Sequence, residues 1–350
     1  MANTVNDFTV NIATANGTGS QSANLILLHS MFEMGVPVSG KNLFPSNISG
    51  LPTWFIIRAS DEGYQAPGDI THIQVVMNKD TWLADVEKAE PGTIIIHNMD
   101  VKLPVERDDC IVLGMPMTKM ARSINPKLAR MIANMYYVGA LAETLGIEES
   151  AIASAVAQQF KGKERAIELN LQAISEGRDF ARENWNCDIG YSVTARNKDP
   201  NTFLIEGNEA AALGCIFGGI NMLSWYPITP SSSLAESIIS WLPKLREAED
   251  GGATCAVIQA EDELAAVGMA LGAGWNGARS FTPTSGPGIS LMSEFIGFGY
   301  YTEIPTVIFN VQRTGPSTGM PTRTQQGDIS LCAYASHGCL LYTSPSPRDG

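Results

Sequence analysis

The segment that decides the fold runs from residue 225 to residue 288 and contains three turns of one design. They read Trp225-Tyr-Pro-Ile-Thr-Pro-Ser-Ser-Ser233, Gln259-Ala-Glu-Asp-Glu-Leu264 and Phe281-Thr-Pro-Thr-Ser-Gly-Pro-Gly288. Each turn follows a short apolar run and leads into a helix-start signal. In a parallel α/β sheet such turns gather at the carboxyl ends of the strands, where ligands bind. The segment therefore predicts a parallel sheet with one ligand crevice, next to the acidic pair Glu261 and Glu263.

Nearer the N-terminus, a strand pattern from Phe8 to Thr14 precedes a glycine loop, Asn16-Gly-Thr-Gly-Ser20. A helical pattern follows over residues 21–34. The order strand, glycine loop, helix lets backbone N–H groups hold a phosphate. The third glycine of the dinucleotide fingerprint is absent, because Ser22 and Ala23 stand there. A tight turn that binds nothing is the alternative interpretation.

The rest of the N-terminal half alternates β-branched runs with helical patterns. Strands are expected over residues 54–59, 71–77, 93–97 and 110–115, and helices over 81–88, 126–145, 148–160 and 163–183. Ser39–Asn47 is interpreted as a loop with a lone lysine, Lys41. Residues 184–201 are polar with little periodicity, as in a linker, and a helix rich in Ala and Gly then precedes a strand over 221–225.

Bulk composition excludes several classes of protein. The chain has 350 residues, 44% of them hydrophobic and 17% charged, which is typical of a globular protein of about two domains. A net charge of −13 argues against nucleic acid or an anionic membrane as a partner. The N-terminus has no signal-peptide pattern and no apolar run is long enough to span a membrane, so a cytoplasmic location is expected.

The six cysteines contain no Cys-x-x-Cys pair, so neither an iron–sulfur cluster nor a zinc site is expected within this chain. Buried free thiols are the simplest interpretation.

The three turns also carry a resemblance to a known family. Tyr-Pro-Ile-Thr-Pro-Ser at 226–231, Glu-Asp-Glu-Leu-Ala-Ala at 261–266 and Thr-Ser-Gly-Pro-Gly at 284–288 resemble the pyrimidine-binding domain of 2-oxoacid:ferredoxin oxidoreductase α subunits. The best match is the long α subunit of the 2-oxoglutarate type, which carries a γ-type domain at its N-terminus. The resemblance implies an α/β fold, with a γ-type three-layer domain followed by a parallel thiamine-diphosphate pyrimidine-binding domain.

The same resemblance implies domain boundaries. We expect the γ-type domain over 1–185, a linker over 186–204 and an incomplete pyrimidine-binding domain over 205–338. Residues 339–350 depart from the family pattern, so we interpret them as a non-native tail on a truncated subunit.

Glu263 is the residue that we expect to activate thiamine diphosphate. It matches the family's activating glutamate, whose carboxyl group contacts the pyrimidine N1′ and favours the imino tautomer that acts as the base. The alternative is that residues 261–263 form only an acidic first helical turn, stabilised by the helix dipole.

Substrate and cofactor contacts are expected on the neighbouring loops. Thr229 matches the family's substrate-binding threonine, and Arg313 aligns with its carboxylate-binding arginine, whose planar fork suits a carboxylate. Because that alignment needs a gap, Arg323 remains a competitor. The resemblance places further residues at the cofactor: Pro227, Ile228, Ser285 and Gly286.

Coenzyme A is associated with the γ-type domain in the family. The residues expected to bind it here are Gly17, Thr18, Gly19, Ser20 and Lys41. For Lys41 a solvated side chain is the alternative to a phosphate contact.

The expected partner is a β subunit. The chain lacks the Gly-Asp-Gly…Asn motif that holds Mg²⁺ and diphosphate, and in the family both this motif and the [4Fe–4S] cysteines lie on the β subunit. We therefore expect αβ pairs that dimerise to α2β2 and pass electrons to ferredoxin during CoA-dependent oxidative decarboxylation, with 2-oxoglutarate favoured over pyruvate or branched-chain 2-oxoacids. Alternatives are a different thiamine enzyme, or a non-catalytic module that binds coenzyme A or a nucleotide.

Overall fold

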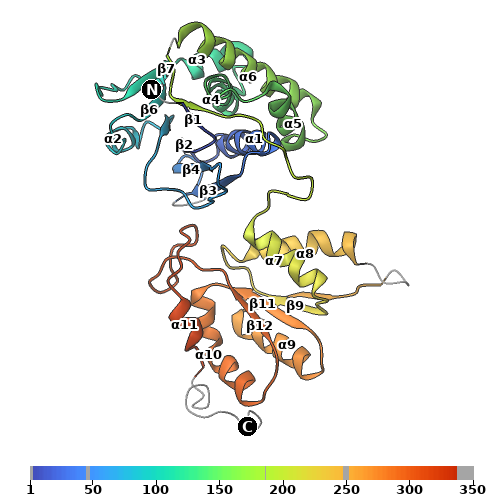
Figure 1. Ribbon diagram of the computed structural model, residues 1–350. Coiled ribbons are helices and arrows are strands. Elements are labelled where there is room, and N and C mark those ends of the chain that lie inside the picture. The colour runs from blue at the N-terminus through green and yellow to red at the C-terminus, as the bar shows by residue number, and fades with distance from the viewer. Residues whose placement is uncertain (1–2, 45–47, 186, 247–251, 337–350) are drawn as a thin grey trace. The chain divides into compact units, whose positions relative to one another are not determined.

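In the computed structural model the contacts within the chain divide it into two units, Met1–Leu204 and Ile205–Gly350 (Figure 1). The structure describes residues 3–44, 48–185, 187–246 and 252–336. The segment 339–350, expected to be a non-native tail, lies outside the described residues.

The first unit is built on a six-stranded mixed sheet with the order β3-β4-β2-β5-β6-β7. The strands are β2 (Phe8–Ala15), β3 (Val38–Leu43), β4 (Pro52–Ala59), β5 (Ile73–Val76), β6 (Ile94–Asn98) and β7 (Ile111–Met115). Strands β2, β5, β6 and β7 run parallel, while β4 is antiparallel to both β2 and β3. The carboxyl ends of the parallel strands therefore meet at one edge of the sheet.

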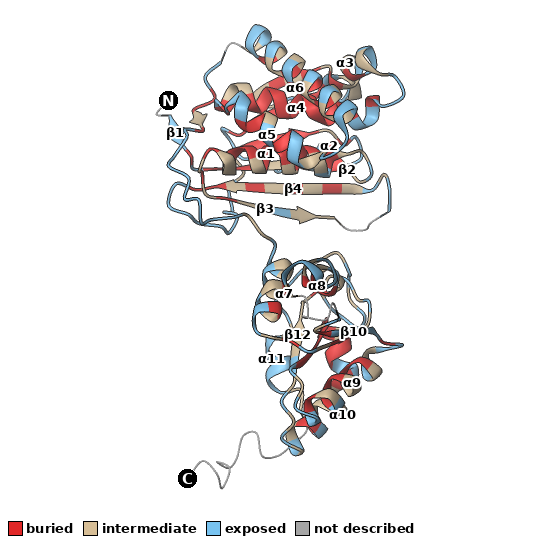
Figure 2. Ribbon diagram, turned by 90° about the vertical axis from the view of Figure 1, so that its right-hand side faces the viewer, coloured by how far each residue is buried: buried red, intermediate tan, exposed pale blue. Residues whose placement is uncertain are grey.

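Helices cover both faces of this sheet. They are α1 (Ser20–Glu33), α2 (Trp82–Glu87), α3 (Met117–Ile124), α4 (Ala129–Leu145), α5 (Glu149–Gln159) and α6 (Glu164–Asn184), with a 3-10 turn η1 (Met99–Val101) after β6. Figure 2 shows buried residues concentrated in α1 and α4, and along β4 buried residues alternate with partly buried ones. A short parallel pair, β1 (Thr4–Val5) with β8 (Tyr191–Ser192), ties residues after α6 to the start of the chain.

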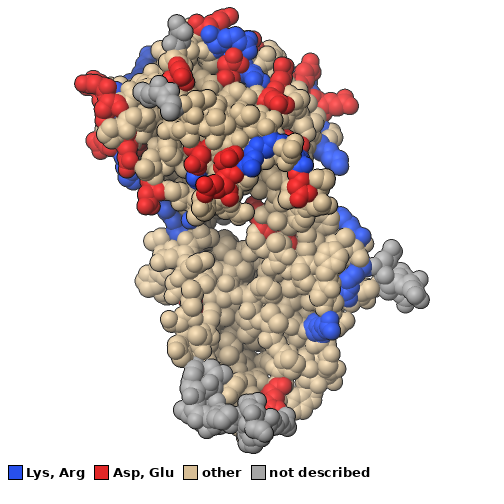
Figure 3. All heavy atoms as spheres, in the orientation of Figure 1, with Lys and Arg blue, Asp and Glu red and all other residues tan. Residues whose placement is uncertain are grey.

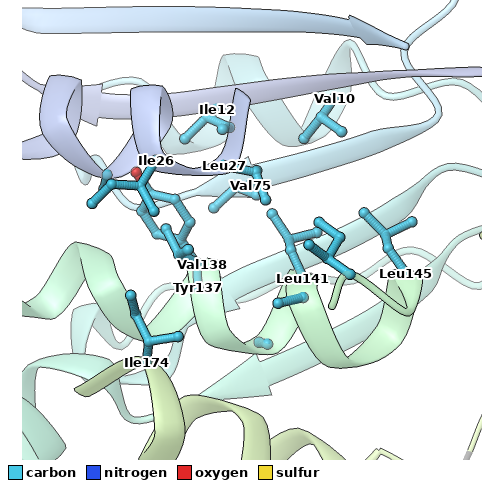
Figure 4. Close-up of a cluster of buried hydrophobic side chains, with 14 of the residues drawn as sticks. Val10, Ile12, Ile26, Leu27, Val75, Tyr137, Val138, Leu141, Leu145 and Ile174 are labelled. Carbon is cyan, nitrogen blue, oxygen red and sulfur yellow. The ribbon is translucent and has the colours of Figure 1, made fainter. Parts of the chain in front are cut away.

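Successive side chains of a strand point to opposite faces of the sheet, and this alternation explains the two cores. Val75 joins the large core with α1 and α4, whereas its neighbour Val76 packs with Trp82 of α2 on the opposite face. The large core contains the fully buried Tyr137, whose hydroxyl donates to Asn24 Oδ1 at 2.6 Å (Figure 4). The hydrogen bond satisfies a polar group that would otherwise be costly to bury.

The second unit is a four-stranded parallel sheet with the order β10-β9-β11-β12. Its strands are β9 (Met222–Trp225), β10 (Ala256–Gln259), β11 (Ser280–Thr284) and β12 (Val307–Asn310). Helices α7 (Gly207–Phe217) and α8 (Ser232–Leu245) pack on one core with Leu223 and Phe281. Helices α9 (Glu263–Trp275) and α10 (Gly286–Tyr301) share another with Ile308, and a short α11 (Ile329–Ala333) follows. The predicted α/β fold class is confirmed.

Two local predictions were wrong for clear physical reasons. Residues 39–47 were expected to be a loop, but Val38–Leu43 forms β3, an edge strand whose polar residues can face solvent. The helix expected from Pro126 begins at Ala129, because Asn125 Oδ1 accepts from the N–H groups of Lys127 and Leu128 at 3.0 and 3.3 Å. That side-chain turn competes with the first helical turn.

Candidate functional site

The carboxyl ends of the second sheet bring the sequence motifs together. From β9 the chain first adds β10 on one side and then returns to add β11 and β12 on the other side. The order in which strands are added to the sheet therefore changes direction between β9 and β11. A ligand crevice in an open α/β sheet lies at such a switch point. The loops that begin at Tyr226 and Ser285 leave the sheet at this position.

The three acidic residues at 261–263 differ in their surroundings. Asp262 is the N-cap of α9, and its Oδ1 accepts from the Ala265 N–H at 2.6 Å. Glu261 is exposed, whereas Glu263 is half-buried in the first turn of the helix. Asp262 is therefore the residue that caps the helix, and the Glu263 carboxylate is not needed as a cap and can contact a ligand.

Glu263 lies against the first turn of α10. A Cβ placed on Gly288 would be 3.2 Å from Glu263 Cγ and only 1.9 Å from Thr284 Oγ1. Position 288 therefore has to be glycine for this approach to occur. Two segments, one with Glu263 and the other with Thr284 and Gly288, thus meet at one helical turn.

Two buried side-chain hydroxyl groups lie at the start of this turn. Ser285, the N-cap of α10, is 0% exposed and Thr284 is 1% exposed. The Oγ atom of Ser285 and the Oγ1 atom of Thr284 have no hydrogen-bond partner in the described part of the chain. Buried hydroxyl groups are normally paired, so both are candidates for contact with a ligand.

Arg313 connects two loops of the site. It is only 8% exposed, and its Nη1 donates to the Thr229 carbonyl at 2.8 Å while Nη2 donates to the Thr318 carbonyl. Its Nε is buried and has no hydrogen-bond partner among the described residues. Burial lowers the pKa of Arg313, and the charge of Glu263 raises it. The structure therefore brings Thr229, Arg313 and Glu263 into one neighbourhood.

The competing arginine has a different environment. The Arg323 carbonyl accepts from the Thr314 N–H at 2.7 Å, which closes the loop that begins after Arg313. That loop also holds a bridge between Thr314 and Met320. The guanidinium that contacts the Thr229 loop is thus that of Arg313.

The remaining predicted cofactor contacts lie on the same edge. The Ile228 carbonyl accepts from both the Ser231 N–H and its Oγ at 2.8 Å, which fixes the turn after β9. Pro227 and the Thr229 side chain are exposed on that turn. Gly286 begins α10 beside Ser285.

In the first unit, the glycine loop is a tight turn. Gly17 and Gly19 both have left-handed backbones, with φ of 76° and 78°. The side chain of Asn134 in α4 donates to the Thr18 carbonyl at 2.7 Å, and Ser20 starts α1. The strand register places Lys41 level with Asn11, four residues before the end of β2 and therefore about 13 Å back along the sheet. Lys41 does not join the loop.

A cavity that the sequence analysis missed opens beside this loop. It has a volume of 390 Å³ and lies at the ends of β2, β5 and β6. Thr18 and Asn134 line it together with three basic side chains, Arg122, Lys127 and Arg130. The three cations lie within nine residues of the sequence, but their proximity to Thr18 could not be read from it.

The described part of the chain has neither a membrane-spanning helix nor a cluster of metal ligands. No helix there is long and apolar enough to cross a membrane. Nor does any group of three or more His, Cys, Asp or Glu side chains there form a possible metal site.

Family models match most of the chain. Residues 9–180 match "Pyruvate ferredoxin/flavodoxin oxidoreductase", and residues 213–349 match "Pyruvate flavodoxin/ferredoxin oxidoreductase, thiamine diP-bdg". The second match extends into 339–350, so the interpretation of that segment stays a prediction.

Individual relatives agree with these models. The α subunit of 2-oxoacid:ferredoxin oxidoreductase 2 from Aeropyrum pernix is 30% identical over 95% of this chain. The 2-oxoglutarate synthase subunit KorA from Archaeoglobus fulgidus is 50% identical over 39% of this chain and 37% of its own length. The chain spans 59% of the Aeropyrum subunit.

A solved structure shows the same fold. The 2-oxoglutarate:ferredoxin oxidoreductase from Magnetococcus marinus, with 2-oxoglutarate, coenzyme A and succinyl-CoA bound, is 30% identical with a TM-score of 0.86. The match covers 95% of this chain and 57% of that one. From these matches and the site described above, the chain belongs to the 2-oxoacid:ferredoxin oxidoreductase family and is related to its α subunits.

Proposed function

We propose that this chain acts in the cytoplasm as the α subunit of a 2-oxoglutarate:ferredoxin oxidoreductase. With a β subunit it would convert 2-oxoglutarate and coenzyme A to succinyl-CoA and CO2, and pass two electrons to ferredoxin. The observation that carries the proposal is the meeting of Thr229, Glu263 and Arg313 at the switch point of the second sheet.

The residues at this edge fit the aminopyrimidine of thiamine diphosphate. Gly286 and Gly288 leave the first turn of α10 without side chains, and two buried hydroxyl groups beside it need partners. Glycine permits close approach of a ring to the backbone. Thiamine diphosphate, when bound, would supply the nucleophilic carbon needed to react with a 2-oxoacid. Glu263, half-buried against Gly288, would hydrogen-bond the pyrimidine N1′ and hold a proton there.

Arg313 is suited to a carboxylate substrate. Two of its N–H groups are used by backbone carbonyls, and the Nε–H, buried without a partner, remains to donate. A buried guanidinium with free donors favours bidentate binding of a carboxylate. The preference for 2-oxoglutarate is supported by the Magnetococcus enzyme and by the KorA subunit, whose names give that substrate.

The basic cavity of the first unit suits coenzyme A. Arg122, Lys127 and Arg130 offer positive charge for its phosphates, next to Thr18 at the start of α1. A helix N-terminus adds a favourable partial charge. A non-catalytic module would also use this cavity, but it would have no need of the residues assembled around Glu263.

Exposed aromatic side chains support a protein partner. On α9 and α10, Trp275 is 67% exposed and Tyr301 is 81% exposed. Figure 3 shows few charged side chains on the visible face of the second unit. Uncharged aromatic surface is typical of the core of an interface. We propose that a neighbouring subunit of an α2β2 assembly covers part of this surface, while the β subunit that would hold Mg²⁺, the diphosphate and a [4Fe–4S] cluster meets the carboxyl edge of the sheet.

The test uses the full-length protein expressed together with its β subunit. We expect reduction of a viologen dye that depends on both 2-oxoglutarate and coenzyme A, with lower kcat/KM for pyruvate and for branched-chain 2-oxoacids. Dye reduction that prefers pyruvate would refute the substrate, and no reduction with any 2-oxoacid would refute the reaction.

A further inference from the structure

We propose that Asp328 is a second carboxylate of the cofactor site, which accepts a hydrogen bond from the 4′-amino group of an aminopyrimidine. This rests on the proposed function of the second unit. Asp328 immediately precedes α11 and belongs to none of the three turns that define the crevice in sequence.

Asp328 is held close to Arg313 and to α10. Its N–H donates to the side-chain Oε1 of Gln312, the neighbour of Arg313, at 2.8 Å. A Cβ placed on Gly286 would lie 2.3 Å from Asp328 Oδ2 and 2.8 Å from its Cγ. The carboxylate therefore lies directly on the Cα of the first residue of α10, and only glycine fits there.

One oxygen of the carboxylate lacks a donor. Asp328 Oδ2 is buried and has no hydrogen-bond partner among the residues that the structure describes. The favourable end of the α10 dipole explains why a negative charge is tolerated there. It does not supply the N–H or O–H donor that a buried carboxylate oxygen needs, and leaving such an atom unpaired is costly. A donor from a ligand would remove that cost.

A second observation points to a ligand at the same turn. Thr284 is 1% exposed, and its unpartnered Oγ1 is directed at Gly288, also in the first turn of α10. Unpaired acceptors and hydroxyl groups thus border both Gly286 and Gly288. The site between them has polar groups at its edges and has open space at the two glycines, which carry no side chain.

The chemistry of the aminopyrimidine matches two carboxylates. Its N1′ and its 4′-amino group lie on opposite sides of the ring, and the amino group is a hydrogen-bond donor. Glu263 packs at Gly288 and Asp328 at Gly286, two residues apart on the same turn. We assign Glu263 to N1′ and Asp328 to the amino group. Asp328 is thus a positioning residue that sets the orientation of the ring against Glu263.

The test compares two ligands that differ at this group. In oxythiamine diphosphate an oxygen acceptor replaces the amino donor. Calorimetry on the full-length protein with its β subunit and Mg²⁺ would give the ratio of Kd values for thiamine diphosphate and oxythiamine diphosphate. Asparagine at 328 can donate through its amide, so Asp328→Asn should shift the ratio toward oxythiamine diphosphate by about 10-fold to 100-fold, the range for a charge-assisted hydrogen bond.

Asp262→Asn is the matched control. It makes the same chemical change near Glu263, but asparagine also caps helices, so the Kd ratio should stay that of the wild type. Should Asp328→Asn fail to fold, as judged by circular dichroism, Asp328→Ser replaces it, with selectivity for the amino ligand reduced by about tenfold.

Two outcomes overturn the inference, and they can be told apart. If the wild type binds thiamine diphosphate and the Asp328 variant keeps the same Kd ratio, Asp328 has no contact with the amino group although the proposed function stands. If the wild-type assembly binds neither ligand, the proposed function fails as well.

Discussion

At the scale of single residues, we expect the proposed function to depend most on Glu263. Because Asp262 is used as the helix cap, Glu263 is the carboxylate of this turn that faces α10. In the full-length complex Glu263→Gln should assemble normally and lose about 100-fold or more in kcat, the usual effect of removing a positioned acid–base group. Glu261→Gln is the control and should stay near wild-type activity. The reverse pattern would show that the wrong carboxylate was chosen.

Arg313 gives a second residue-scale prediction. Lysine keeps the charge but cannot hold the Thr229 and Thr318 carbonyls and a carboxylate together. We expect Arg313→Lys to raise KM for the 2-oxoacid by about tenfold or more while the Kd of thiamine diphosphate changes little. Arg323→Lys is the matched control. If only the Arg323 variant raised KM, the assignment of the carboxylate site would be wrong.

His97 makes the stability depend on pH. Burial lowers its pKa below the usual value of 6.5 for a histidine. The unfolded chain therefore binds a proton at a higher pH than the folded one, so stability is complete above about 6.5 and falls as pH decreases toward the folded pKa. Urea unfolding at pH 7.5 and 5.5 should give a larger difference in midpoint for the wild type than for His97→Gln. An equal difference in urea midpoint for the two proteins would show that His97 does not make the stability depend on pH.

At the scale of elements, α4 and α6 require glycine where they cross. A Cβ on Gly139 would lie 2.0 Å from the Ile174 carbonyl oxygen, and one on Gly177 would lie 2.5 Å from that of Tyr136. Gly139→Ala should reduce the free energy of unfolding by about 1–3 kcal/mol through overpacking. Gly214→Ala in α7, where nothing lies within 4 Å, should be neutral or slightly stabilising. Equal stability of the two variants would contradict the packing account.

Elements whose own residues specify them could be predicted, and elements defined by their neighbours could not. Buried parallel strands such as β6 and the turns after β9 and β11 carry apolar runs and turn residues that act locally. Strand β3 is polar and is a strand only because β4 pairs with it. The basic cavity needs Thr18 beside Asn134, 116 positions apart, and Asp328 reaches Gly286 only in the folded unit. Such proximity leaves no periodic signal.

At the scale of the whole molecule, we propose that the chain supplies one side of a shared site. The groups proposed to bind the pyrimidine belong to this chain, while the diphosphate side is proposed to come from the β subunit. The 350-residue chain alone should therefore bind no iron, reduce no viologen dye and hold thiamine diphosphate weakly, because capture of the diphosphate normally carries much of the affinity. Calorimetry that gave a Kd equal to that of the complex would contradict a shared site.

The most direct test of the central claim is hydrogen exchange in the full-length complex with and without thiamine diphosphate and Mg²⁺. The claim is that the carboxyl edge of the second sheet holds the cofactor. We predict that thiamine diphosphate slows exchange within residues 226–231, 261–268 and 284–290, with the β2–α1 loop at 16–20 unchanged until coenzyme A is added. Protection confined to the first unit, or absent from all three turns, would contradict the claim.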